Sequence, residues 1–518
     1  MTAENVLSSG PAKVRSREGL LQEICQNNDL LSMGSTIARV VSLASDDEEA
    51  LSDLVYLVLS DVALTQKILR LANTVFYRSA AGARVTTVSK AIFLLGFDTV
   101  KTSALAMLLV DGLTNQSHAR SVRAELSQAV CASVLSRELA RKGSAYQGAE
   151  EAAIAALFKN LGRVLVASHA HAAYSEIMEL ADKGGNSLQD ASEQIMGCSF
   201  ESLASSVLQK WKIPDTIIRA ALFSSKEKLK SPQNRQEWMQ HIAAFGSEAG
   251  LLISGKKNAD QAKRLEALQE RFGESLNLDK EKIQSLLANV EPEVGALADT
   301  IGLDKSADQP EPSSPVPVPG LPSELLLSAN IPGDMQPDAR HPDGKPVNAR
   351  ERLLVGIQDV TQMIASGRCK VNELMLLVLE TLYNSMGFRF AALCLKDRKT
   401  NHYIARVTLG EKQAERQTGF TFPASSGNDL FQMAMQNDVD LMISDSTAPN
   451  ISGLIPSWHR KLFPDARSFI VLSLVVDKIH VGFYYADRTQ PTPDGVPPEE
   501  ISLIKILKSQ VMSMLQKR

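Results

Sequence analysis

Apolar residues recur at helical spacing through most of the first 300 residues. One set occupies positions i, i+3, i+4, i+7 and i+8, namely Leu51, Leu54, Val55, Val58 and Leu59. This spacing places them on one face of an α-helix. The same periodicity predicts helices over 125–142, 150–168, 171–183, 201–210 and 260–272. Strand-like alternation is almost absent in this part, so the pattern predicts an all-α helical bundle.

Two short segments carry signals for the start and end of a helix. Asp61 stands directly before an apolar stripe, where an aspartate can accept hydrogen bonds from the exposed N–H groups of the first turn. Thr86 and Thr87 precede a second helix, for which Gly96 is the expected C-cap. Asn73 ends the first helix and is expected to bond exposed backbone groups, with recognition of a partner as the alternative.

The pattern changes in the C-terminal third of the chain. Helical spacing fills 350–366 and 371–386, and a closing helix is predicted over 499–515. Between them, short β-rich runs bounded by polar turns predict strands over 388–395, 403–409, 417–422, 441–444, 468–476 and 480–486. Helices at both ends of an antiparallel sheet indicate an α+β domain.

A proline-rich segment separates these two patterns. Ten of the 22 prolines lie between Leu303 and Val347, and proline disfavours both helix and central strand. The sequence therefore predicts a multidomain chain: a disordered N-terminus at 1–18, an all-α domain at 19–300, a linker at 303–347 and an α+β domain at 350–518.

Composition narrows the function classes. The net charge of −4 disfavours a protein that coats nucleic acid, so no nucleic-acid partner is expected. The purest apolar run near the C-terminus, at 469–476, has eight residues, whereas a membrane helix needs roughly 20. The first eighteen residues are polar and lack the apolar stretch typical of a signal peptide, and the five cysteines form no CxxC pair. We therefore expect a cytoplasmic protein that does not contact a membrane.

Three segments resemble the signature of the HDOD domain. They are 60–73 with Phe76 and Tyr77, then 85–96, and then 211–214. One departure is Val62, where the family usually has proline. The resemblance spans roughly residues 20–240 and implies an all-α fold related to the HD phosphohydrolases. Those enzymes bind one or two metal ions through histidines and a His-Asp pair, and the metal activates water against a phosphoester.

Lys159 and Asn160 stand where the resemblance places the His-Asp pair. A lysine cation and an asparagine amide are unsuited to anchor a divalent metal. Phe200 and Phe223 stand where related sequences often have histidine, and only four histidines precede residue 300. We therefore expect no catalytic residue, no metal and no cofactor in this domain. The alternative is a metal-dependent HD-type phosphohydrolase that acts on a nucleotide or cyclic dinucleotide.

The C-terminal part resembles a GAF domain in the order of its elements and in the segments 374–386, 440–445 and 481–487. This resemblance implies small-molecule sensing or dimerisation. Cys394, Asp445 and Trp458 are the candidate ligand-binding residues, but each has a simpler interpretation. Cys394 can be a buried small hydrophobe, Asp445 a turn cap, and Trp458 a packed aromatic side chain.

The end helices of this domain carry apolar stripes, at 353–364 and 501–515. Such stripes can bury each other within one subunit or across a homodimer, and we favour the homodimer. Taken together, the sequence predicts a bacterial, non-catalytic signal-transduction or scaffold protein. Its HDOD-like domain would bind protein partners of a signalling pathway, and its GAF-like domain would bind a small molecule or dimerise.

Overall fold

The computed structural model describes thirteen ranges of the chain. These are residues 28–44, 48–77, 85–113, 119–143, 146, 148–184, 187–225, 227–254, 261–303, 339–424, 429–477, 479–492 and 495–516. The predicted disordered N-terminus and most of the predicted linker lie outside these ranges.

The chain folds as two compact units that do not coincide with the predicted domains. The first unit contains residues 1–43, 74–79 and 98–304. The second contains residues 44–73, 80–97 and 305–518. Two segments of the predicted N-terminal domain are therefore grouped with the C-terminal residues, because their contacts are made there.

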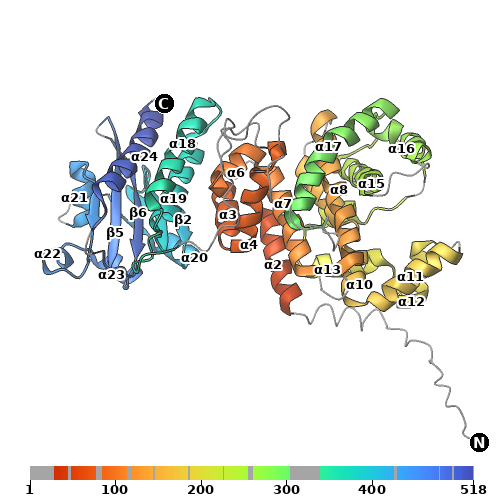
Figure 1. Cartoon of the computed structure of the whole chain (residues 1–518), viewed down its shortest axis with the longest axis horizontal. Coiled ribbons are helices and arrows are strands. Elements are labelled where there is room, and N and C mark those ends of the chain that lie inside the picture. Colours follow the sequence, from red (N-terminus) through yellow and green to blue (C-terminus); the bar gives the residue numbers. More distant parts are fainter. Residues whose placement is uncertain are drawn as a thin grey trace, which may run out of the picture. The chain divides into compact units, whose positions relative to one another are not determined.

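The first unit is helical throughout its described residues (Figure 1). Its helices are α2 (Asn28–Ser42), α7 (Phe97–Leu113), α8 (Ala119–Gly143), α9 (Ala149–Phe158), α10 (Leu161–His169), α11 (His171–Gly184), α12 (Leu188–Met196), α13 (Phe200–Lys210), α14 (Asp215–Ala221), α15 (Arg235–Ser254), α16 (Gln261–Leu276) and α17 (Lys280–Ile301). The single helix predicted over 150–168 is wrong, since the chain turns between α9 and α10 at Lys159 and Asn160.

Small residues allow close helix packing in this unit. A Cβ atom on Gly246 of α15 would lie 2.1 Å from the Ser136 hydroxyl of α8, so only glycine fits this approach. Gly34 of α2 similarly contacts the Trp211 ring, at which a Cβ atom would lie 2.1 Å from the ring. The third HDOD-like segment therefore has a packing role, because its tryptophan fills the space beside Gly34.

The second unit contains three helices from the N-terminal half of the chain, α3 (Glu48–Leu59), α4 (Val62–Ala72) and α6 (Val88–Leu95). The predicted N-caps are confirmed: Asp61 accepts a hydrogen bond from the Leu64 amide, and Thr87 accepts one from the Lys90 amide. Gly96 is the predicted C-cap and has a φ of 86°, which L side chains rarely adopt.

The rest of the second unit is an α+β fold around one six-stranded sheet. The strand order is β3-β2-β1-β6-β5-β4, and all paired strands are antiparallel. The strands are β1 (Phe390–Asp397), β2 (His402–Gly410), β3 (Thr421–Pro423), β4 (Leu441–Ile443), β5 (Ser468–Val476) and β6 (Ile479–Arg488). The helices are α18 (Ala349–Ala365), α19 (Val371–Met386), α20 (Gln413–Gly419), α21 (Leu430–Asn437), α22 (Pro449–Ser452), α23 (Ser457–Leu462) and α24 (Pro498–Gln516).

One predicted strand is partly wrong. The run 417–422 was predicted as a strand, but α20 occupies its first half and only the short β3 follows. The two faces of the sheet are distinguished by β6. The Tyr484 hydroxyl donates to the Met375 oxygen of α19 (3.1 Å), so its neighbours Phe483 and Tyr485 point to the opposite face.

Among the described residues, no single helix has both the length and the apolar character to cross a membrane. Helices α6 and α7 follow each other along the chain with a bend between them. Only when the two are counted together do they reach the length and apolar composition of a membrane-spanning helix.

Candidate functional site

Lys159 lies in the turn that joins α9 to α10. Its ammonium group donates hydrogen bonds to the main-chain oxygens of Ala221 (3.3 Å), the last residue of α14, and of Phe223 (2.5 Å), just after that helix. Carbonyl groups at the end of a helix lack intrahelical partners and carry partial negative charge. The Lys159 ammonium group therefore lies beside the C-terminal end of α14 and provides hydrogen bonds to both main-chain oxygens.

The surroundings of Lys159 shift the pKa of its ammonium group. Burial lowers its pKa to about 8, because desolvation disfavours the ammonium form. Glu201 and Glu248 raise this pKa, and Arg271 lowers it. Arg271 also donates to Glu248 and to the main-chain oxygen of Ser225. Two cations thus hold the segment that follows α14.

Three other positions were compared with metal ligands: Asn160, Phe200 and Phe223. Asn160 is 7% exposed, and its Nδ2 atom has no hydrogen-bond partner. The Phe223 ring lies 5.8 Å from the ring of His241, and His241 Nδ1 lies 2.6 Å from the Ser275 hydroxyl. Phe200 is buried. Within the described ranges, no group of three or more His, Cys, Asp or Glu side chains is arranged to hold a metal ion.

A buried polar group around Glu125 in the same unit was not predicted. Glu125 of α8 is 4% exposed and accepts hydrogen bonds from Arg163 (2.5 Å) and from the Tyr174 hydroxyl (2.6 Å). Burial and the Glu125 charge raise the pKa of Tyr174, so the phenol stays protonated and donates. The signal in the sequence was a glutamate on the apolar face of a helix. Its partners come from α10 and α11, which the sequence does not indicate.

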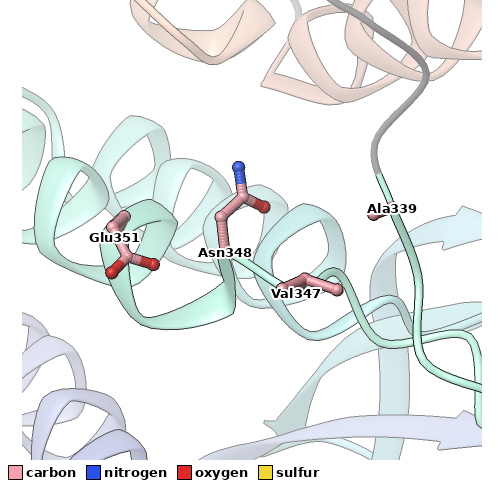
Figure 2. Close-up of a pocket in the computed structure, with 4 residues that line it drawn as sticks. All are labelled: Ala339, Val347, Asn348 and Glu351. Carbon is pink, nitrogen blue, oxygen red and sulfur yellow. The ribbon is translucent and has the colours of Figure 1, made fainter.

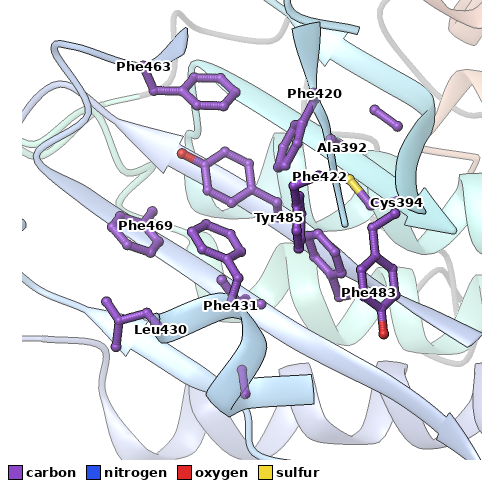
Figure 3. Close-up of a cluster of buried hydrophobic side chains, with 14 of the residues drawn as sticks. Ala392, Cys394, Phe420, Phe422, Leu430, Phe431, Phe463, Phe469, Phe483 and Tyr485 are labelled. Atoms are coloured by element: carbon purple, nitrogen blue, oxygen red, sulfur yellow. The ribbon is translucent and has the colours of Figure 1, made fainter. Parts of the chain in front are cut away.

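One face of the sheet is filled by aromatic side chains (Figure 3). We call this group the aromatic cluster; its rings are Phe390, Tyr403, Phe420, Phe422, Phe431, Phe463, Phe469, Phe483 and Tyr485, with Trp458 packed against it. Trp458 stacks on Phe422 with ring centres 4.6 Å apart. The rings therefore fill this face of the sheet.

A chain of polar contacts crosses the aromatic cluster. His459 is 2% exposed, and its Nε2 atom lies 2.8 Å from the Tyr485 oxygen. The Tyr485 hydroxyl donates to Asp487 (2.9 Å), and Asp487 accepts from Arg389 (2.6 Å). Arg389 also donates to Asp465 at the surface (2.7 Å). These contacts satisfy the buried polar groups and connect the interior of the cluster to the surface.

The structure brings two of the three predicted ligand-binding residues together. Cys394 is fully buried in the aromatic cluster and Trp458 packs against it. Asp445 lies elsewhere, after β4, where it pairs with Arg467 (3.0 Å) and accepts from the Thr447 amide (2.9 Å). These bonds hold the pKa of Asp445 well below its usual range. The turn-cap interpretation of Asp445 is thus observed, and ligand binding at these residues stays a prediction.

An open depression of about 390 Å³ lies at the start of α18 (Figure 2). It is lined by Ala339, Val347, Asn348 and Glu351. Its lining offers one carboxylate and one amide, and none of the predicted site residues contributes to it.

Residues 30–227 match the family model of the HDOD domain. The predicted HDOD domain is confirmed for these residues, and it includes α3, α4 and α6 of the second unit as well as most of α2 and all of α7 to α14 of the first. No curated protein matches the chain.

Three solved structures are similar to parts of the chain. An HDOD domain protein of unknown function from Geobacter sulfurreducens shows 18% identity and a TM-score of 0.41, over 55% of this chain and 98% of that one. A proposed phosphohydrolase from Shewanella amazonensis shows 17% identity and a TM-score of 0.41, over 54% and 97%. The GAF domain of an Acinetobacter phosphoenolpyruvate-protein phosphotransferase shows 12% identity and a TM-score of 0.25, over 32% and 92%.

Proposed function

We propose that this chain is a non-catalytic signal-transduction or scaffold protein. Its HDOD domain would bind protein partners, and its GAF-like C-terminal domain would sense a small molecule or dimerise. The observation that supports the loss of catalysis is the Lys159 ammonium group, which bonds the Ala221 and Phe223 oxygens where an HD enzyme has its His-Asp pair. A divalent cation beside this ammonium group would be repelled, and the apolar Phe200 and Phe223 offer it no ligand.

The aromatic cluster favours one of the two roles proposed for the C-terminal domain, dimerisation rather than small-molecule sensing. Cys394 and Phe431 are fully buried, and Trp458 covers Phe422. A small molecule would have to displace these rings, which costs dispersion contacts and buried apolar area. Dimerisation requires no such rearrangement, so we favour it over sensing at this face.

Metal content and hydrolysis test the first part of the proposal. The full-length protein is loaded with excess Mn²⁺, desalted and measured by elemental analysis, and hydrolysis of bis-p-nitrophenyl phosphate is followed in parallel. We expect substoichiometric metal and no turnover above buffer. The matched variant is Lys159→Met, which removes the ammonium group; it should also bind no metal, because the histidines are missing as well.

Stoichiometric Mn²⁺ in the wild-type protein together with hydrolysis would contradict this proposal. That outcome would instead support the alternative of a metal-dependent phosphohydrolase. Stoichiometric metal that appears only in Lys159→Met would show that the ammonium group alone blocks a site, and the interpretation of Phe200 and Phe223 would then be wrong.

A further inference from the structure

Glu380 lies in the middle of α19 and is fully buried in the second unit. Its carboxylate accepts three hydrogen bonds from the first residues of α6: from the Val88 amide (2.6 Å), the Ser89 amide (2.8 Å) and the Ser89 hydroxyl (2.5 Å). A C-terminal glutamate thus binds the start of a helix that belongs to the HDOD domain.

These three bonds complete the capping of α6. The first amides of a helix have no intrahelical acceptor and lie at the positive end of the helix dipole. Thr87 accepts from the Lys90 amide, and Glu380 takes the two amides before it. Burial is the largest cause and raises the pKa of Glu380 above its usual value, and the bonds from Ser89 and Val88 act in the opposite direction. Burying this carboxylate therefore costs free energy unless α6 provides these hydrogen-bond donors.

A second polar contact lies one residue further along α6. The Lys90 ammonium donates to the Gln362 side-chain oxygen of α18 (2.8 Å) and lies 4.0 Å from the Asp359 carboxylate. Lys90 is 3% exposed and Asp359 is 1% exposed, so the pair is shielded from water. Two C-terminal helices thus present acceptors to one end of α6, and α6 presents amides, a hydroxyl and an ammonium group to them.

The position of Glu380 in the sequence is informative. It interrupts a run in which Leu374 to Leu379 are all buried apolar residues. A charge at this place contributes nothing to packing against the sheet, and a leucine would cost less to bury. The hydrogen-bond donors of Val88 and Ser89 in α6 explain why a charged residue stands at this position.

We propose that the amino-terminal end of α6 is a carboxylate-binding interaction surface of the HDOD domain, and that Glu380 of α19 is its intramolecular ligand. The kind of partner that this surface fits is a helix with a single carboxylate among apolar side chains. The contact couples α6 directly to the C-terminal domain, in addition to the covalent linker. This inference deepens the proposed protein-binding role of the HDOD domain, and its test requires neither a metal nor an external partner.

Hydrogen exchange on the full-length protein tests the proposal. The variant Glu380→Gln keeps the shape of the side chain and removes its charge. We expect the Val88 and Ser89 amides, which donate to Glu380, to exchange about 10- to 100-fold faster in this variant, the factor that corresponds to weakening a charged hydrogen bond. Glu415→Gln, on the exposed face of α20, is the matched control and should leave exchange at 88–90 unchanged.

A second variant keeps the test decisive if Glu380→Gln does not fold. Ser89→Ala removes one of the three donors and leaves the carboxylate in place, so a smaller increase in exchange at 88–90 is expected. In the double variant the two effects should be less than additive, because both changes act on one contact. Exchange equal to wild type in Glu380→Gln or, where that variant does not fold, in Ser89→Ala would overturn the proposal, as would strict additivity in the double variant. Its failure would leave the metal and hydrolysis results untouched.

Discussion

His459 shows how one buried side chain is fixed by its neighbours. The Tyr485 hydroxyl has one proton, which it donates to Asp487. The Tyr485 oxygen must then accept at its contact with His459, so His459 carries its proton on Nε2. Burial is the largest cause that lowers the pKa of His459 to about 3, and Arg389 contributes to the shift. The imidazole therefore stays neutral in the folded protein.

This assignment predicts a pH dependence of stability. The unfolded chain protonates His459 near pH 6.5 while the folded chain does not, so the free energy of unfolding must fall as the pH drops below that value. We expect a loss of about 2 kcal/mol from this group between pH 7 and pH 5. Urea unfolding of wild type and His459→Phe over this range measures it.

His459→Phe should flatten this part of the pH profile, because phenylalanine does not titrate and Tyr485 keeps its bond to Asp487. His341→Gln is the control, since it removes an exposed histidine from the same unit. Parallel profiles of wild type and His459→Phe between pH 5 and pH 7 would instead show that His459 takes up its proton equally in the folded and unfolded chain.

At the scale of elements, Asn73 joins two parts of the HDOD signature. Its Nδ2 atom donates to the main-chain oxygens of Leu69 (2.7 Å) and Val85 (2.8 Å). Its Oδ1 atom accepts from the Val85 amide (2.9 Å). The predicted backbone-bonding role of Asn73 is thus confirmed. It ends α4 and at the same time fixes the residue that leads into α6.

Asn73→Ala should lower the free energy of unfolding by about 1–3 kcal/mol, because it leaves the buried amide and oxygen of Val85 without partners. Chemical denaturation of the full-length variant measures the loss. Asn289→Ala, an exposed asparagine of α17, should change stability by less than about 0.5 kcal/mol. Comparable losses in the two variants would show that the Val85 contacts are replaced by water.

The sequence predicts features that depend on contacts between residues close together in the chain, and it misses features that depend on contacts between distant residues. The caps at Asp61 and Thr87 were predictable because each side chain bonds an amide three residues away. The break between α9 and α10 was missed because the apolar pattern continues through it, while Lys159 is held there by residues more than 60 positions away. The partner of Glu380 was missed for the same reason, since Ser89 is 291 positions distant.

At the scale of the whole molecule, the predicted apolar stripes are largely used within the subunit. Leu353 and Val360 of α18 are buried, as are Ile504, Leu507 and Val511 of α24. The alternative in which the end helices bury each other within one subunit is therefore observed for these residues. A homodimer would have to use the apolar side chains that remain exposed on the same helices.

Two such side chains, Leu354 of α18 and Ile506 of α24, lie near the line along which these two helices meet, which we call the outer seam. Leu354 is 39% exposed and Ile506 is 42% exposed. Spacings of seven and four residues place Leu354 on the same face as Thr361, and Ile506 on the same face as Gln510. The Gln510 side-chain nitrogen donates to the Thr361 hydroxyl (2.7 Å), so the two faces meet. This seam is where we expect a second copy of the chain to pack.

Sedimentation velocity of the full-length protein tests the homodimer. Replacing both residues (Leu354→Glu with Ile506→Glu) would bring four carboxylates together across a symmetric interface and remove its apolar contacts. We expect dimer dissociation to become about 100-fold easier, which is roughly 2.7 kcal/mol. Met433→Glu is the control, because Met433 is similarly exposed (41%) but lies on α21. A wild-type protein that sediments as a monomer at micromolar concentration, or a double variant as dimeric as wild type, would contradict this interface.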